Sequence, residues 1–266
     1  MITFLLYLLN SLGRWVIQYS HAFFSALQLT LVILRRGHIY QRQHRKNKLI
    51  KHAITAQIIF SGIDTLFPTL FILSIFIGFG VTAQLILFLQ TFSNEQEVIR
   101  LLTEFIALQL SPTLTAIILI ARSGSAITVD IGNMYVNYET KGLALLGVDP
   151  YIYLAYPRII GLAISQMALA VYFATLSMLF GIFFAGLLGS PSNFKYFFII
   201  IDSFNNQELF LFLLKNLLSG AAIAGYACYF AFNIQSSITE VPQATQKSIV
   251  HSLIAVFMIN TVFAMV

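Results

Sequence analysis

The stretch DIGNMYVNYETKGLALLGVDP, residues 130–150, is far more polar than the rest of the chain. It carries four charged side chains and three glycines, whereas the whole chain of 266 residues is 58% hydrophobic and only 9% charged. Apolar runs precede and follow it. Half-polar backbone between two such runs is not stable among lipid tails, so we expect this stretch to lie outside a bilayer and to contact a partner.

The composition around this stretch is that of a membrane protein. The mean hydropathy is +0.84, and 25 of the residues are phenylalanine. Several apolar runs reach the length of about 20 residues that crosses about 30 Å of hydrocarbon. We therefore predict an all-α integral membrane protein of spanning helices, with any chemistry done in the membrane or by a partner. The single cysteine, Cys228, excludes an internal disulfide and a cysteine-based metal cluster.

The first 34 residues are predicted to form an amphipathic helix. Polar side chains recur there every three or four positions, from Asn10 to Gln28, and therefore share one helix face. Such a helix favours the membrane interface. A sixth spanning helix is the alternative, because residues 22–34 are very apolar.

The following residues, 35–52, are strongly basic and hold seven of the fifteen Lys and Arg residues. Positive charge beside a spanning helix is retained on the cytoplasmic side, where it can also contact anionic lipid head groups. Aromatic residues do not interleave with the charges as on a base-stacking surface, so we expect no nucleic-acid partner. We divide the chain into residues 1–52, the interfacial helix and basic segment, and residues 53–266, a domain of spanning helices.

Five spans are predicted in the second domain, at residues 66–89, 101–121, 159–188, 209–232 and 248–266. The segments expected inside carry four Lys or Arg residues beyond the basic run, and the outside loops carry two. The C-terminus is therefore expected outside. Small residues at helical spacing are expected where the spans touch, and they are Gly181, Ala185, Gly189, Gly220, Ala224, Cys228 and Ala231.

The polar stretch belongs to one predicted cytoplasmic loop, residues 121–158. Residues 130–144 are predicted to form a helix, Gly147 to end it, and Asp149 with Pro150 to begin another turn or helix. A short helix parallel to the membrane between the second and third spans can pass force to a cytoplasmic motor. Its exposed anchors are expected to be Met134, Tyr135 and Tyr138. A simple position of the tyrosines at the membrane interface is the alternative.

Three sequence motifs resemble those of the MlaE/YrbE-type permeases, the membrane subunits of MCE-associated ABC transporters that move phospholipids or related lipids. They are RSGSAITVDIG (122–132), GVDPYIYLAYPR (147–158) and SIVHSLIAV (248–256). The resemblance begins near Gln57 and reaches the C-terminus. The residues that carry its central part are Arg122, Gly124, Ser125, Ala126, Asp130, Ile131, Gly132, Gly147, Asp149, Pro150, Tyr153, Leu154, Pro157 and Arg158.

The resemblance implies several partners. A second permease subunit, identical or not, would form a dimer with a lipid cavity at its axis, and a cytoplasmic ABC ATPase on each would bind ATP and Mg²⁺. An MCE-type lipid-binding protein and phospholipid complete the set. The location is a bacterial inner membrane or, alternatively, a plastid inner envelope. The coupling region, residues 130–146, would contact the ATPase through Asp130, Gly132, Met134, Tyr135, Tyr138, Glu139 and Lys141.

The chain departs from the family pattern inside the spans. The family's R-E-L-G-P run reads LQLSP here, with Gln109 at the Glu position, and Asn260 stands where an Asp is common. We expect Gln109, His251 and Asn260 to line a lipid cavity, with interhelical hydrogen bonds as the alternative. Glu104 and Lys215 lie near the outer ends of their spans and are expected to reach the membrane interface.

Enzyme classes do not fit the spacing of polar residues. The chain has no G-x-S-G nucleophile turn, no cluster of Asp residues for a metal, and no P-loop. We therefore expect a permease subunit that binds no cofactor itself. The alternative is a non-transporting membrane scaffold that docks a cytoplasmic partner.

Overall fold

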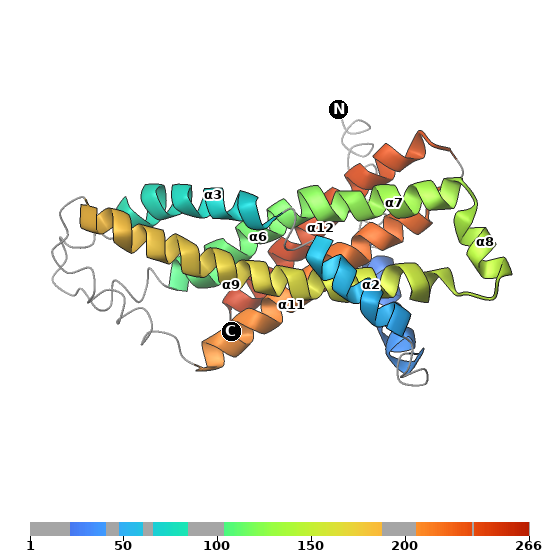
Figure 1. The fold of residues 1–266 in the computed structure, drawn as a ribbon, viewed down its shortest axis with the longest axis horizontal. Coiled ribbons are helices and arrows are strands. Elements are labelled where there is room, and N and C mark those ends of the chain that lie inside the picture. The colour runs from blue at the N-terminus through green and yellow to red at the C-terminus, as the bar shows by residue number, and fades with distance from the viewer. Residues whose placement is uncertain are drawn as a thin grey trace, which may run out of the picture.

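The structure is a computed structural model, and it describes residues 22–40, 48–60, 66–84, 104–187, 206–235 and 237–265. Regular structure within these residues is entirely helical, which confirms the all-α prediction. Figure 1 shows long helices packed along one another. After a first helix of residues 22–40, the elements are α2 (Lys48–Ile58), α3 (Phe67–Ile77), η2 (Gly78–Ala83), η3 (Glu104–Leu110), α6 (Ser111–Leu119), η4 (Ile120–Gly124), α7 (Ser125–Val136), α8 (Glu139–Leu145), η5 (Tyr151–Ala155), α9 (Tyr156–Leu187), α11 (Asn206–Phe232) and α12 (Glu240–Ala264), where η denotes a π-helix.

Four helical runs in the described residues are long and apolar enough to cross a membrane. They agree with four of the predicted spans and are Glu104–Val136, Tyr151–Leu187, Asn206–Phe232 and Glu240–Ala264. The remaining predicted span, 66–89, corresponds to a shorter apolar helix, Phe67–Val81, and its last residues lie outside the described part of the chain. The chain is thus a membrane protein, and the number of five spans stays a prediction.

The first of these runs continues well past the membrane exit predicted at Arg122. It joins η3, α6, η4 and α7 into 33 residues, about 50 Å at 1.5 Å per residue, whereas the hydrocarbon layer is about 30 Å thick. The next run, η5 with α9, has 37 residues. Both runs therefore extend beyond a bilayer, and α8 connects their ends (Figure 1).

The predicted helix of residues 130–144 is wrong in one respect, because it is broken into α7 and α8. The break lies at Asn137 and Tyr138, and Tyr138 has a left-handed backbone with φ of 60°. Asn favours such breaks because its short amide competes with the helical hydrogen bonds. The predicted end at Gly147 is confirmed. Gly147 has φ of 77°, and the amide of Val148 donates to the carbonyl of Leu143, which closes a left-handed C-terminal cap.

The small residues of α11 lie where it meets its neighbours, as predicted, whereas Gly189 lies outside the described residues. Gly220 of α11 lies so close to α9 that a Cβ atom there would be 2.7 Å from the Cα of Ala163. Ala224, Cys228 and Ala231, on the same side of α11, are fully buried. Without a hydrophobic force between helices in lipid, such close backbone contact is what favours their association.

The helix of residues 22–40 also packs through small residues. Thr30 lies against Gly225 of α11, and Gly37 lies against the ring of Tyr156 at the start of α9. The phenol of Tyr226 donates to the carbonyl of Phe23 over 3.3 Å. This helix is therefore part of the bundle in its described residues. Residues 1–21 lie outside the described part, so the choice between an interfacial and a spanning N-terminal helix stays a prediction.

Candidate functional site

The end of the molecule at α8 is the first candidate site. Asp130 and Gly132 lie on α7, and both contact other parts of the bundle. The Asp130 carboxylate accepts a hydrogen bond from the Arg158 guanidinium over 3.0 Å and thereby links α7 to α9. Gly132 is buried, and a Cβ atom there would lie 2.7 Å from Ile234, in the turn after α11. Both residues fix the position of α7.

Two of the three predicted anchors are not exposed. Met134 and Tyr135 are half-buried and pack against the apolar core. They lie one helical turn beyond Ile131, which is fully buried, so the same face of α7 continues into the bundle. The prediction that Met134 and Tyr135 are exposed is therefore wrong. Tyr138 is exposed, as predicted, and the Lys141 ammonium lies 4.6 Å from the centre of its ring.

The most exposed apolar side chains of this region are two leucines that the sequence analysis did not select. Leu145 is 88% exposed and Leu146 is 80% exposed. They end α8, and Glu139 begins it, where a carboxylate is favourable at the positive end of a helix. We call Tyr138, Leu145 and Leu146 the apolar tip. The signal in the sequence was a Leu-Leu pair inside a polar loop, where burial within the chain was not expected.

The other motif residues lie in the parts of the two long helical runs that extend toward α8. A Cβ atom placed on Gly124 would lie 3.3 Å from the side chain of Ile223, so α11 approaches α7 and η4 closely there. The Asp149 carboxylate accepts a hydrogen bond from the amide of Tyr151, and Pro150 precedes η5, which confirms the helix start predicted at Asp149 and Pro150. Arg122, Ser125 and Tyr153 are exposed or partly exposed, and Pro157 is buried.

A cavity of about 500 Å³ between η3, the start of α11 and the end of α12 is the second candidate site. Its wall combines apolar side chains such as Phe212 and Phe263 with Glu104, Gln109 and Lys215. A cavity with one apolar wall and a few polar groups suits an amphiphilic ligand. Among the three predicted cavity residues, Gln109 lines this cavity.

The position of Lys215 differs from the prediction that it reaches the membrane interface. Its side chain is only 3% exposed, and Nζ donates to the carbonyl of Leu108 over 2.8 Å and to Oε1 of Gln109 over 3.2 Å. Pro112 explains the first bond. A proline has no amide hydrogen, so it cannot donate to the carbonyl four residues earlier, which is that of Leu108. Lys215 supplies this missing donor from α11.

Beside Lys215, a group of buried amides joins three helices. Gln166 of α9 donates through Nε2 to the carbonyl of Pro112 (3.2 Å), to Oγ1 of Thr115 (3.1 Å) and to Oδ1 of Asn216 (3.3 Å). Gln166 and Asn216 are fully buried. We call Thr115, Gln166, Lys215 and Asn216 the polar centre. The sequence analysis did not select its amides, although polar residues inside apolar spans are the signal that finds them.

The other two predicted cavity residues lie elsewhere. His251 packs beside the rings of Tyr226 and Phe230, with ring centres 6.2 and 4.8 Å away. Asn260 donates to the hydroxyl of Thr113 over 3.1 Å, which is the interhelical bond left open as the alternative. The three residues are therefore not brought together in one cavity. Among the residues that the structure describes, no group of three His, Cys, Asp or Glu side chains can hold a metal ion.

Comparison with known proteins gives a consistent result. The family model described as "Permease MlaE" matches residues 54–266. A probable ABC transporter permease protein of Synechocystis sp. is 27% identical, over 94% of this chain and 91% of that protein. The intermembrane phospholipid transport system permease protein MlaE of Haemophilus influenzae is 24% identical, over 93% and 92%. The chloroplastic protein TRIGALACTOSYLDIACYLGLYCEROL 1 of Arabidopsis thaliana is 28% identical, over 72% of this chain and 55% of that protein.

Proposed function

Because the chain belongs to the MlaE permease family, we propose that it is the membrane subunit of an ABC transporter that moves phospholipid or a related lipid between membranes. A separate ATPase subunit binds ATP and Mg²⁺ and hydrolyses the nucleotide. The observation that carries this proposal is the α8 end. Two helical runs, each longer than the thickness of a bilayer, meet at α8. Two almost fully exposed leucines lie at this end of the molecule.

In this proposal α8 is the coupling helix and the apolar tip is its contact with the ATPase. Exposed contiguous apolar side chains are costly in water and are typical of a protein interface. The Asp130–Arg158 ion pair holds α7 against α9, so a force applied at α8 moves both runs together. Met134 and Tyr135 take the role of internal packing in place of partner contact.

The proposed orientation places α8 and the turn between α11 and α12 in the cytoplasm, following the distribution of positive charge. With five spans, the C-terminus is outside. The membrane is a bacterial inner membrane or a plastid inner envelope, and both types of relative occur among the similar proteins. A second permease subunit and an MCE-type lipid-binding protein complete the assembly. The cavity beside Lys215 is the proposed lipid contact near the outer face.

The experiment that tests this function replaces the leucines of the apolar tip. The double variant L145A/L146A should insert normally but lose its ATPase subunit on purification, because interface truncations of this kind cost about 2 kcal/mol or more. Lipid-stimulated ATP hydrolysis in proteoliposomes should fall with it. The matched control is L217A/L218A, a similar pair on α11 that is partly exposed on the spanning surface.

Two results would contradict the proposal. If L145A/L146A retains its ATPase and hydrolyses ATP like the parent, α8 is not the coupling helix. If the parent chain binds an ATPase but its bound lipid does not change with ATP, the chain is a scaffold and not a transporter subunit.

A further inference from the structure

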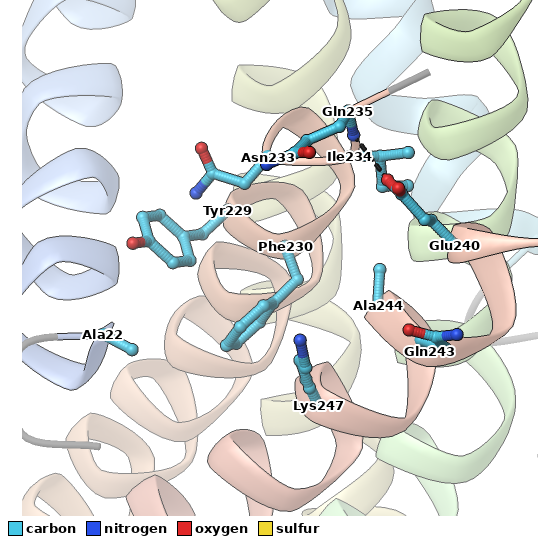
Figure 2. A pocket seen from close by; sticks show the side chains of 10 residues that line it. All are labelled: Ala22, Tyr229, Phe230, Asn233, Ile234, Gln235, Glu240, Gln243, Ala244 and Lys247. Carbon is cyan, nitrogen blue, oxygen red and sulfur yellow. Dashed lines mark hydrogen bonds between the residues drawn. The ribbon is translucent and has the colours of Figure 1, made fainter. Parts of the chain in front are cut away.

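A second cavity lies at the other end of the α11–α12 pair, where the chain turns from one helix into the next. Its volume is about 580 Å³, within the range of about 300–1,000 Å³ that is usual for small-molecule sites. Figure 2 shows its lining, which comes from the end of α11, from the start of α12, and from Ala22 of the first helix.

One wall of this cavity is aromatic and is held in place from behind. The rings of Tyr229 and Phe230 meet edge to face, with centres 5.2 Å apart. The ring of Phe230 also packs against His251, with centres 4.8 Å apart, and Phe230 is 9% exposed. The wall is therefore formed before any ligand enters. His251 positions it without lining the cavity.

Most of the other lining residues are polar, and one is a cation. In Figure 2 the ammonium of Lys247 extends between Phe230 and Ala244. Within the described part of the chain, Lys247 forms no ion pair. The carboxylate of Glu240 also lines the cavity, but its Oε2 accepts a hydrogen bond from the backbone amide of Gln235 over 2.7 Å and thus closes the turn. Lys247 is the charge available to a ligand.

The location of the cavity indicates what kind of ligand can reach it. Phe230 and Lys215 are 15 positions apart on α11, which corresponds to about 22 Å along the helix. The two cavities thus lie near opposite ends of one spanning helix pair, at a separation approaching the thickness of the hydrocarbon layer, about 30 Å. An aromatic wall with a lysine at this depth matches the level of lipid head groups, where Tyr and Lys side chains are enriched.

We propose that this cavity binds the phosphodiester head group of a membrane phospholipid. Lys247 pairs with the phosphate, the amides of Asn233 and Gln243 donate to the remaining oxygens, and Tyr229 with Phe230 contacts the glycerol and the first acyl carbons. The assignment to the cytoplasmic leaflet rests on the orientation in the proposed function, whereas the binding itself does not. The ligand enters from the bilayer and not from the aqueous phase.

Photocrosslinking tests this site in the full-length chain. With benzoylphenylalanine in place of Tyr229, which keeps an aromatic ring on the wall next to the glycerol and acyl carbons, the chain is reconstituted in vesicles of phosphatidylglycerol and irradiated, and the cross-linked lipid is measured by mass spectrometry. The substitution K247E should reduce the cross-linked fraction about tenfold, because a charge-assisted bond to phosphate is lost and a repulsion is introduced. K247R should retain it. A244W should also reduce it, since Ala244 lines the cavity and the larger ring fills it.

The controls separate a specific site from a general charge effect. K141E makes the same charge change on α8, away from the cavity, and should leave the cross-link unchanged. In vesicles of digalactosyldiacylglycerol, which has no phosphate, the cross-link to lipid should fall about tenfold. Excess glycerol 3-phosphate in the buffer should have no effect.

The proposal is overturned if K247E and A244W cross-link phosphatidylglycerol like the parent, or if the phosphate-free lipid cross-links equally well. It is also overturned if soluble glycerol 3-phosphate abolishes the cross-link, because the site then takes a soluble phosphate. None of these measurements needs an ATPase. Failure of the L145A/L146A test with an intact cross-link therefore removes the coupling role of α8 and leaves the lipid site.

Discussion

At α8 the chain exposes leucines to solvent, and in the polar centre it buries a lysine and two amides. Both arrangements are the reverse of those in an ordinary soluble domain. The two arrangements differ in whether the chain itself supplies their partners. Most polar atoms of the polar centre find hydrogen-bond partners on η3, α6 and α11, although Oε1 of Gln166 is buried without one in the described residues, so the chain itself accounts for most of this group. The leucines find no such cover in the described residues. A function that needs a partner is therefore indicated by α8 more than by the buried charges.

The largest difference in stability is expected when glycine is replaced by alanine on α11, in the packed bundle, and on α8. G220A should destabilise the chain by about 2 kcal/mol, because the new Cβ atom overlaps backbone atoms of α9 that cannot move aside. G142A on α8 should be neutral or stabilising by up to about 1 kcal/mol, because nothing lies within 4 Å of its Cβ position and Ala favours a helix over Gly. Thermal unfolding in one detergent measures both. Equal shifts of the melting temperature would remove the distinction between the packed bundle and the free helix.

A medium effect is expected for the two lysines. K215M should lower the stability by about 1 kcal/mol, because the Leu108 carbonyl and the Gln109 amide lose their donor inside the bundle. K141M should have a smaller effect, since Lys141 is exposed and its ammonium lies over the ring of Tyr138. The same unfolding assay applies. An unchanged or higher stability of K215M would mean that burying the charge costs as much as its two bonds contribute.

The smallest effect on stability is expected for D130N. The Asp130 carboxylate is 72% exposed, and exposed ion pairs contribute about 0.5 kcal/mol or less. If the pair keeps α7 and α9 together during coupling, lipid-stimulated ATP hydrolysis by the assembled transporter should fall more than the stability does. The difference from the parent should diminish at high salt, which screens the pair. A large loss of stability, insensitive to salt, would show that Asp130 has a packing role instead.

Much of the fold followed from local features of the sequence. The length of the apolar runs predicted five spans, of which the structure agrees with four, the small residues from Gly220 to Ala231 predicted the contact face of α11, and Gly147 predicted the end of α8. Each of these depends on neighbours within one helix or one turn. The break at Tyr138 was not predictable in this way, because a left-handed conformation is rare for tyrosine and gives no compositional signal.

The candidate site depended on contacts between distant parts of the chain. Lys215 is buried because a proline more than a hundred positions away leaves a carbonyl without its donor. Tyr135 is half-buried because α7 packs against the turn that follows α11, and Met134 is half-buried because it packs against the main apolar core. The exposed leucines of α8 could be found from sequence only as an apolar pair in a polar loop, and their degree of exposure depends on where α7 ends and η5 begins.

The contact between the first helix and α11 has a consequence for the synthesis of the chain. Phe23 and Tyr226, which share a hydrogen bond, are 203 positions apart. At about 5–20 residues per second, the ribosome needs about 10–40 seconds to make the residues between them. The helix of residues 22–40 is thus made long before its contact surface is complete. Gly37 can meet Tyr156 once the start of α9 has been made, whereas Thr30 meets Gly225 only after α11 has been made, so the first helix docks in two steps.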